Sequence, residues 1–548
     1  MLPNEQAETG KRRVVLPAPA LLLAATSVLA LMATNLRQTT FGDVAPSLAG
    51  ALGFAALAWL AAVLARRRAD AASAVIACLW TVVCLFHVGI FGGLNAWLDG
   101  WHSMLASLPF AVAALLLGTA AIHWLRIPWT PVHLVLTGIG LVTLAPPLFQ
   151  ATAYEWRYGG DRSIRDAAEA TAEAPEMAGG TPVTPAARPP DIYHFIFDRY
   201  GSAETLSRVY GIDRTIDGFL VERGFYVATE SYSNYLKTGH SLASTFSMDY
   251  LDALAEAPIG DGGNWGPILA MLDDHRVGRF LRAQGYAHLQ FGSWWTGTYR
   301  SSAADENFPE GFSEFGMHYM RRTILRPLFH VLPRTPFAMR LDWDNAQCQR
   351  VARQVERIKE IGQRDEPVYV FAHILVPHGP FVFAPDGRCL TQMEAAARGD
   401  WQGYIDQIAY ADRIIEDVVT TLQERDGPSP IILIQADEGP FPSRDDRVPW
   451  QEASSEELRE KLGILNAVYF PGVDYDLLRG DMTPVNTYRM VFNTFFGTGL
   501  PILPDRLYAF PDDRTLYEFH DVTDRVRTGA GDMPAGSDGH QPAVPTLE

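Results

Sequence analysis

The stretch IILIQADEGP, residues 431–440, is an apolar run that ends in two carboxylates, Asp437 and Glu438. A second stretch of this kind, DIYHFIFDRYG at residues 191–201, ends in Asp198. A short apolar run followed by Asp-Glu-Gly or Asp-x-x-Gly is typical of a buried parallel strand that leads into a loop. Ligands of open α/β sheets bind at that carboxyl edge. Three carboxylates crowded there cannot all stay ionised without a cation, so the pattern predicts a metal site.

The region from residue 191 to about residue 525 alternates strand-like and helix-like stretches. Strands are expected at 192–197, 288–292, 368–375, 431–435 and 465–470, and the clearest amphipathic helix covers 403–424. This alternation predicts one large α/β domain with a doubly wound sheet.

The first part of the chain is apolar. Stretches long enough to cross a bilayer lie at roughly 14–34, 45–65, 71–92, 104–124 and 131–150, which predicts a five-helix transmembrane bundle. Lys and Arg residues lie before the first, after the second and between the last two stretches, so the N-terminus is expected in the cytoplasm. The remainder is then extracytoplasmic, in a multi-pass membrane protein. An alternative is that the first stretch is a cleaved signal peptide, although no small-x-small site follows it.

Four segments are therefore expected. They are a five-span domain at 1–155, a linker at 156–190, an extracytoplasmic domain at 191–526 and a disordered tail at 527–548. The linker is rich in Ala, Pro, Glu and Thr without an apolar period, and the tail is rich in Gly, Pro, Ser and Asp.

The extracytoplasmic part is strongly acidic. The chain has a net charge of −18, whereas its first 150 residues contain eight basic and five acidic side chains and so contribute +3. The rest therefore carries −21, which argues against a nucleic acid as a partner, because nucleic-acid binding needs clustered Lys and Arg.

The chain has four cysteines. Cys78 and Cys84 fall in the third apolar stretch, where they are expected to be packing residues. Cys348 and Cys389 belong to the outer part, where a disulfide is allowed but cannot be deduced from two isolated positions. No Cys or His spacing typical of a zinc site is present.

Further reactive side chains follow other expected strands. The stretch HILVPHGPF at 373–381 contains His373 and His378, and SYSNYLKTGHSLAS at 231–244 contains Thr238, His240 and Ser241. Chemistry on a phosphate or sulfate ester needs a nucleophile, a cation and a proton donor, and these stretches provide candidates for each.

Each candidate also has a structural interpretation. Asp198 can cap a helix that begins near Ser202, and Asp437 with Glu438 can form a solvated turn. Thr238 can be a turn residue. His378, and more so His373, can be a structural hydrogen-bond donor. The joint occurrence of these residues favours a site.

The chain resembles the sulfatase-like branch of the alkaline phosphatase superfamily. In layout it is similar to lipoteichoic acid synthases and lipid A phosphoethanolamine transferases, which have five spans, a linker and an extracytoplasmic sulfatase-fold domain. The stretches that carry this resemblance are, in order, DIYHFIFDRYG, GFYVATESYSNYLKTGHSLAS, HILVPHGPFVF, YIDQIAYADRIIEDVVTTL, IILIQADEGP and MTPVNTYRMVFNTFFG. The C/S-x-P-x-R motif of true sulfatases is absent, so sulfate-ester hydrolysis by that route is not expected.

The resemblance implies a role for individual residues. Asp198 and Asp437 would be metal ligands, Thr238 would be both nucleophile and ligand, and His378 would hold the substrate or protonate the leaving oxygen. Glu438 stands where the family usually has His, and an all-oxygen ligand set should prefer Mn or Mg over Zn. The cation of Arg199 beside the site opposes a second divalent ion, so one metal ion is expected.

Head-group contacts are expected from the stretch FGSWWTGTYR at 291–300, through Trp295 and Arg300, together with His240 and His378. Packing in the core is the alternative for Trp295.

The predicted function is that of a membrane-anchored transferase or hydrolase of phospho-substituents on membrane lipids or envelope glycans. The alternative is an inactive sensor or scaffold that binds head groups or proteins, which the exchange to Glu438 favours. A transporter is poorly supported, because the apolar stretches contain almost no ionisable residues beyond His87 and His123.

Overall fold

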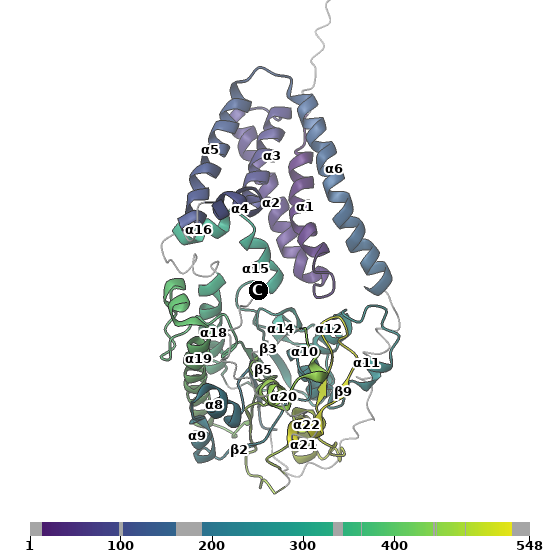
Figure 1. Ribbon diagram of the computed structural model, residues 1–548, viewed down its shortest axis with the longest axis vertical. Coiled ribbons are helices and arrows are strands. Elements are labelled where there is room, and N and C mark those ends of the chain that lie inside the picture. The colour runs from purple at the N-terminus through teal and green to yellow at the C-terminus, as the bar shows by residue number, and fades with distance from the viewer. Residues whose placement is uncertain are drawn as a thin grey trace, which may run out of the picture. The chain divides into compact units, whose positions relative to one another are not determined.

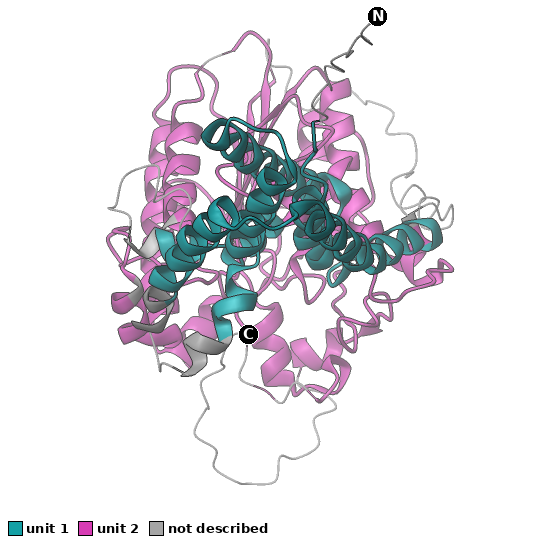
Figure 2. Cartoon of the chain, turned by 90° about the horizontal axis from the view of Figure 1, so that it is seen from above, with its two compact units in different colours: residues 1–157, 314–338 teal, residues 158–313, 339–548 magenta. Residues whose placement is uncertain are grey.

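The computed structural model describes residues 14–97, 102–159, 189–331, 343–362, 364–441, 444, 447–476 and 478–528. Residues 160–188 of the predicted linker and 529–548 of the predicted tail lie outside the described residues. The chain divides into two compact units (Figure 2). The helical unit consists of Met1–Arg157 and Glu314–Ala338, and the sheet unit consists of Tyr158–Ser313 and Met339–Glu548.

The helical unit is built entirely from helices in its described residues (Figure 1). They are α1 Ala18–Ala33, α2 Phe41–Arg66, α3 Ala71–Leu85, α4 His87–Trp97, α5 His102–Trp124, α6 Trp129–Tyr154, the π-helix η1 Glu155–Gly159, α15 Glu314–Arg321 and α16 Leu325–Val331.

Three of these helical segments are long and apolar enough to cross a membrane, namely Phe41–Arg66, Ser107–Trp124 and Trp129–Tyr158. Helices α1 and α3 are apolar but shorter. The stretch expected as a third span divides at Phe86 into α3 and α4. The structure therefore supports a membrane protein without establishing five spans.

The sheet unit contains a seven-stranded sheet in the order β2-β7-β6-β1-β5-β3-β4. The strands are β1 Ile192–Phe197, β2 Tyr226–Val227, β3 Ala287–Phe291, β4 Glu306–Asn307, β5 Val368–Ile374, β6 Ile431–Gln435 and β7 Asn466–Tyr469, and β8 Tyr508–Ala509 pairs with β9 His520–Asp521 separately. Strands β1, β3, β4, β5 and β6 are parallel, whereas β7 is antiparallel to β6 and β2 is antiparallel to β7. The prediction of a mainly parallel α/β sheet is confirmed.

Both faces of this sheet are covered. Alternate side chains of β1 enter different cores, Ile192 and Ile196 on one face and Phe195 and Phe197 on the other. The helices of this unit are α8 Ala203–Tyr210, α9 Ile216–Glu222, α10 Thr238–Ser247, α11 Asp252–Glu256, α12 Gly266–Asp273, α13 Arg276–Ala283, α14 Thr296–Tyr299, α18 Trp343–Lys359, α19 Gln392–Gln423, α20 Ser455–Leu462, α21 Thr487–Phe496 and α22 Thr523–Thr528, with 3-10 turns at Trp450–Glu452 and Pro484–Asn486. Helices α10, α12, α13 and α21 supply the core of the first face, and α18 and α19 supply that of the second.

A disulfide joins Cys348 in α18 to Cys389 before α19. Since it closes a loop with a sequence separation of 41 residues, chain entropy predicts a stabilisation of about 4 kcal/mol. We expect Cys348→Ser/Cys389→Ser to lower the melting temperature of the sheet unit and to make it insensitive to dithiothreitol. Equal melting of the oxidised and reduced wild-type protein would contradict this expectation.

Candidate functional site

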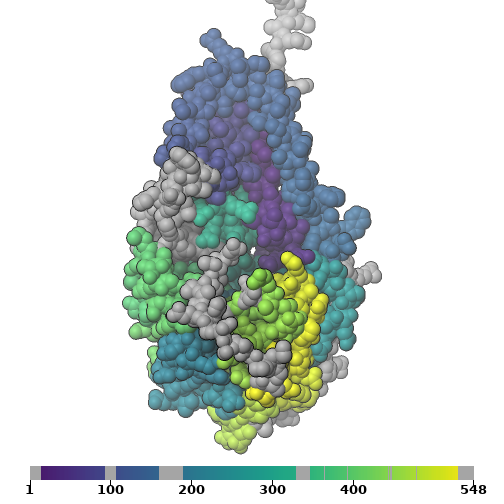
Figure 3. Space-filling view, in the orientation of Figure 1, coloured from purple at the N-terminus to yellow at the C-terminus, as the bar shows by residue number. Residues whose placement is uncertain are grey.

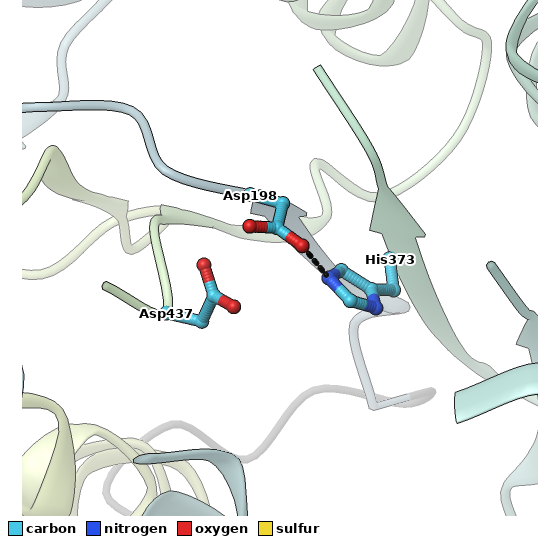
Figure 4. A group of neighbouring side chains, drawn as sticks. All are labelled: Asp198, His373 and Asp437. Atoms are coloured by element: carbon cyan, nitrogen blue, oxygen red, sulfur yellow. Dashed lines mark hydrogen bonds and ion pairs between the residues drawn. The ribbon is translucent and has the colours of Figure 1, made fainter. Parts of the chain in front are cut away.

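Three adjacent strands in the middle of the sheet place Asp198, His373 and Asp437 together (Figure 4). Asp198 follows β1 directly, and Asp437 lies two residues beyond β6. His373 is the penultimate residue of β5, in register with Ile196 of β1. Because the strand order is β6-β1-β5, one ligand atom of each side chain lies within 4.8 Å of the others, and all three residues are buried.

The hydrogen bonds of this cluster leave an oxygen free for a ligand. His373 Nε2 is 3.2 Å from Asp198 Oδ2, and His373 Nδ1 is 2.7 Å from Thr298 Oγ1, so the imidazole is oriented from both sides. Asp198 Oδ1 is buried and has no hydrogen-bond partner among the described residues. Two carboxylates and an imidazole with such an oxygen fit a divalent metal ion.

The charges of the cluster also fit a cation. Burial, followed by the charges of Asp198 and Glu438, raises the pKa of Asp437 to about 7. For Asp198 burial acts in the same direction, but His378, the hydrogen bond from His373 and Arg199 outweigh it and lower its pKa. A metal ion would relieve the repulsion between the two carboxylates.

Thr238 is the first residue of α10 and lies beside this cluster. It is close enough to Asp437 for its side chain to lower the pKa of that carboxyl, against the larger upward effect of burial. Thr238 is half-buried, whereas the rest of α10 is buried. The N-terminal N–H groups of a helix have no partners within the helix and attract anions. A side-chain hydroxyl and the free N–H groups of a helix terminus therefore lie at one position.

Gly239 is required beside Thr238 by close packing. A Cβ atom at this position would lie 2.8 Å from the Trp265 ring and 2.9 Å from Ile268. The small residue after Thr238 thus lets the start of α10 pack closely against the first core.

Glu438 does not belong to the group of three. It is buried, with Oε1 3.1 Å from Arg199 Nε and Oε2 2.9 Å from Lys461 Nζ. Lys461 is 0% exposed, and burial lowers its pKa to about 8 although Glu438 opposes the shift. The structure thus brings together a mixed nitrogen and oxygen set, with His373 in the group in place of Glu438.

Three cations surround the ring of Phe441. The ring centroid lies 3.7 Å from Lys461 Nζ, 4.2 Å from Arg199 Cζ and 5.6 Å from Lys237 Nζ. Since Lys237 precedes Thr238 and Arg199 follows Asp198, this positive region adjoins the cluster.

Arg199 has a left-handed backbone, with φ 65°. Such a conformation is costly for a residue with a side chain and persists where its neighbours impose it. The Tyr404 hydroxyl donates to the Arg199 carbonyl at 2.9 Å, and the Arg199 N–H donates to Asp437 at 3.3 Å. The strained turn therefore directs the guanidinium to Glu438.

His378 lies next to Asp198. Its backbone N–H donates to the Asp198 carbonyl at 3.1 Å, and its half-buried ring lies 6.0 Å from that of Trp294. Burial, followed by the charge of Arg199, lowers the pKa of His378 to about 4.

The structure places the other expected head-group residues as follows. His240 is 0% exposed, and its Nε2 is 3.0 Å from the Leu516 carbonyl oxygen among aromatic rings of the first core. Trp295 packs against the same core, with its ring 6.3 Å from that of Trp265. Arg300 is exposed beside the Tyr299 ring.

The structure contradicts the alternative interpretations of the acidic residues, namely that Asp198 caps a helix and that Asp437 and Glu438 form a solvated turn. Ser202 caps α8, so Asp198 is not needed there, and Asp437 and Glu438 are each 2% exposed rather than solvated. Sequence reasoning named His373 as a candidate but not as a member of the ligand set, and it missed Lys461. Lys461 had a signal in the sequence, because it lies between Leu458 and Leu462 on the apolar face of α20.

If His373 is a ligand, His373→Ala should weaken binding of a divalent metal by at least tenfold. The matched control is His288→Ala, a buried histidine on the neighbouring strand β3. Calorimetric titration of both variants with Mn, Mg and Zn measures the effect. Equal affinity of the two variants would remove His373 from the ligand set.

The model of the sulfatase family matches residues 215–462. No curated protein is detectably similar in sequence. Among solved structures, the C-terminal periplasmic domain of EcEptC from Escherichia coli, in complex with Zn, is similar at 10% identity and TM-score 0.40, covering 63% of this chain and 95% of that one.

Two further structures are also similar. For the integral membrane lipooligosaccharide phosphoethanolamine transferase A from Neisseria meningitidis, the identity is 15% and the TM-score 0.35, covering 87% of this chain and 95% of that one. The lipoteichoic acid synthase LtaP from Listeria monocytogenes has 13% identity and a TM-score of 0.35, covering 65% and 81%.

Proposed function

We propose that this chain, which contains a sulfatase family domain, is a membrane-anchored, metal-dependent transferase or hydrolase of phospho-substituents on lipids or envelope glycans. The observation that carries the proposal is the position of Thr238, which begins α10 next to Asp437 of the buried Asp198–His373–Asp437 cluster. A nucleophile, an anion-binding helix terminus and a metal-ligand set coincide there.

Asp198, His373 and Asp437, with the Thr238 hydroxyl, would hold one divalent ion. When bound, such an ion lowers the pKa of a hydroxyl and neutralises charge on the phosphoryl group. The expected preference for Mn or Mg assumed that every ligand atom is an oxygen. With the imidazole nitrogen of His373 among the ligands, Zn is equally compatible. The titration described above distinguishes these metals.

In the proposed reaction Thr238 Oγ attacks phosphorus in line, and the bond from phosphorus to the leaving oxygen breaks. The hydroxyl proton of Thr238 passes to a base in the site, and the departing alkoxide receives a proton, so that phosphothreonine and a free alcohol result. Water or a glycan hydroxyl then attacks phosphorus, the bond from phosphorus to Thr238 Oγ breaks, and the proton lost by the attacking group returns to Thr238. The N–H groups of the first turn of α10 would bind the phosphoryl oxygens, and His378 would donate a hydrogen bond to the leaving oxygen.

The positive region around Phe441 would attract the anionic substrate. Arg199, Lys237 and Lys461 outnumber Glu438 and Asp513, the acidic residues that pair with them, and so leave a net positive charge beside Thr238. His240 and Trp295 would support head-group recognition indirectly, because they pack in the first core. Arg300 is exposed and keeps its proposed contact with the head group.

The proposed location is a bacterial inner membrane, with the N-terminus in the cytoplasm and the sheet unit outside. The apolar helices and the Cys348–Cys389 disulfide support it, because disulfides persist in oxidising compartments. Anchoring would raise the effective concentration of a lipid substrate at the bilayer surface.

A second candidate is an inactive sensor or scaffold that binds head groups or proteins. The observation that favours it is the pairing of Glu438 with Arg199 and Lys461, outside the ligand cluster.

The test of catalysis is the intact mass of the full chain after incubation in bilayers of bacterial lipids. We expect a mass gain equal to a phosphoryl-containing group in the wild type and in Thr238→Ser, but none in Thr238→Ala. A gain that survives in Thr238→Ala would refute Thr238 as nucleophile. No gain in any variant supplied with Mn, Mg or Zn, together with no release of a lipid alcohol, would favour the sensor.

A further inference from the structure

One segment of the sequence of the outer part has an unusual charge. Residues 315–341 contain five arginines and no acidic side chain. The part of the chain after residue 150 otherwise carries a large negative charge. A local excess of positive charge in such a protein indicates an anionic partner.

The described part of this segment, residues 315–331, folds with the helical unit. Helices α15 and α16 belong to that unit, although the strands before and after them in the sequence belong to the sheet. Phe315 and Tyr319 are buried in the core formed with α1 and α2, and Tyr319 Oη is 2.8 Å from Ser27 Oγ.

Backbone hydrogen bonds fix its position further. The Ile324 N–H donates to the Cys84 carbonyl at 2.8 Å, and the Val88 N–H donates to the Arg322 carbonyl at 3.1 Å. Cys84 lies at the C-terminal end of α3 and Val88 at the start of α4. The segment is therefore held at one end of the apolar bundle.

Apolar side chains are exposed on the neighbouring helices. Helix α16 packs on α5, where Phe110 is 53% and Leu117 71% exposed, and on α4 Ile90 is 46% exposed. In Figure 3 the teal atoms of this segment lie at the surface beside the blue atoms of α4 and α5. Acyl chains would cover these apolar surfaces, which places the end of the bundle at the level of the lipid phosphates.

We propose that Arg321, Arg322 and Arg326 form a binding surface for the phosphate groups of anionic phospholipids. Arg321 and Arg322 are exposed and Arg326 is half-buried. Guanidinium groups bind phosphate oxygens in a bidentate manner, and each cation near an anionic surface adds to the attraction. The inference rests on the membrane location in the proposed function but not on catalysis.

The test is native mass spectrometry of the full chain released from bilayers of phosphatidylglycerol and phosphatidylcholine. We expect preferential retention of phosphatidylglycerol, reduced at least tenfold in Arg321→Gln/Arg322→Gln/Arg326→Gln. The corresponding triple Lys variant should keep most of it, because it keeps the charge. The matched control is Arg208→Gln/Arg223→Gln/Arg388→Gln, which removes three cations from surface ion pairs of the sheet unit.

Several outcomes would overturn the proposal. They are equal retention of both lipids by the wild type, unchanged retention by the triple Gln variant, and full displacement by millimolar inorganic phosphate, which would indicate a site for the free ion. If the triple Gln variant does not fold, loss of retention with rising salt in the wild type tests the charge dependence instead. Thr238→Ala should retain the lipid normally, so failure of the proposed catalysis and failure of this surface give different results.

Discussion

Glu438→Leu is expected to destabilise the sheet unit by about 3–5 kcal/mol, because removal of one partner leaves buried charges unpaired. In the wild type Glu438 contacts both Arg199 and Lys461, and the Lys461 side chain is fully buried. Loss of the carboxylate would leave an ammonium group without its counter-charge in a region that also contains Arg199. Denaturant unfolding followed by circular dichroism measures the effect.

The double variant Glu438→Leu/Lys461→Leu should recover much of this loss, since apolar residues often replace a buried ion pair without net cost. Glu456→Leu is the control, because Glu456 forms an exposed ion pair with Arg208 and should change stability by less than about 1 kcal/mol. If Glu438→Leu were as stable as the wild type but had lost metal affinity, Glu438 would be a ligand and not a structural partner.

Asp437→Asn is expected to lower turnover of the phospho-substrate by at least about 10³-fold, because Asp437 is a proposed metal ligand and lies beside the proposed nucleophile Thr238. The same substitution should stabilise the metal-free protein, since it removes one of the two crowded carboxylates of the cluster. Turnover of labelled lipid, and thermal melting in the presence of a chelator, measure the two effects.

Asp505→Asn is the matched control for Asp437→Asn, which is expected to lower turnover and to raise the stability of the metal-free protein. Asp505 is also a buried carboxylate, but it accepts hydrogen bonds from Thr483 N–H at 2.9 Å and Thr483 Oγ1 at 2.7 Å. We expect this substitution to destabilise the protein and to leave turnover unchanged. A loss of stability in Asp437→Asn would show that its carboxylate is structural.

Much of the fold follows from local pattern. The strand at 192–197 and the strand at 431–435 have the bounds expected from their apolar runs, and the other three expected strands differ by one or two residues. A buried parallel strand is apolar on both faces, and its end is marked by polar or Gly residues, so neighbouring residues alone reveal it. The expectation that Asp198 and Asp437 lie at the same edge depended only on this rule and on the parallel direction of β1 and β6.

Residue pairing across the sheet could not be deduced in this way. His373 lies within an apolar strand, and only the order β6-β1-β5 places its ring against Asp198. Glu438 is adjacent to Asp437 in the chain, but its carboxylate turns to Arg199 and Lys461, and the position of Lys461 depends on the packing of α20. Likewise, nothing local shows that α15 and α16 fold with the apolar helices.

The sequence by itself therefore determined the class of fold, the apolar segments and the acidic residues at the carboxyl edge, because strand ends and hydrophobic runs are properties of neighbouring residues. Only the tertiary structure decided that His373 joins Asp198 and Asp437 in the cluster and that Glu438 pairs with Arg199 and Lys461 instead. The reason is that distances between residues remote in the chain depend on strand order and helix packing, which no local pattern specifies.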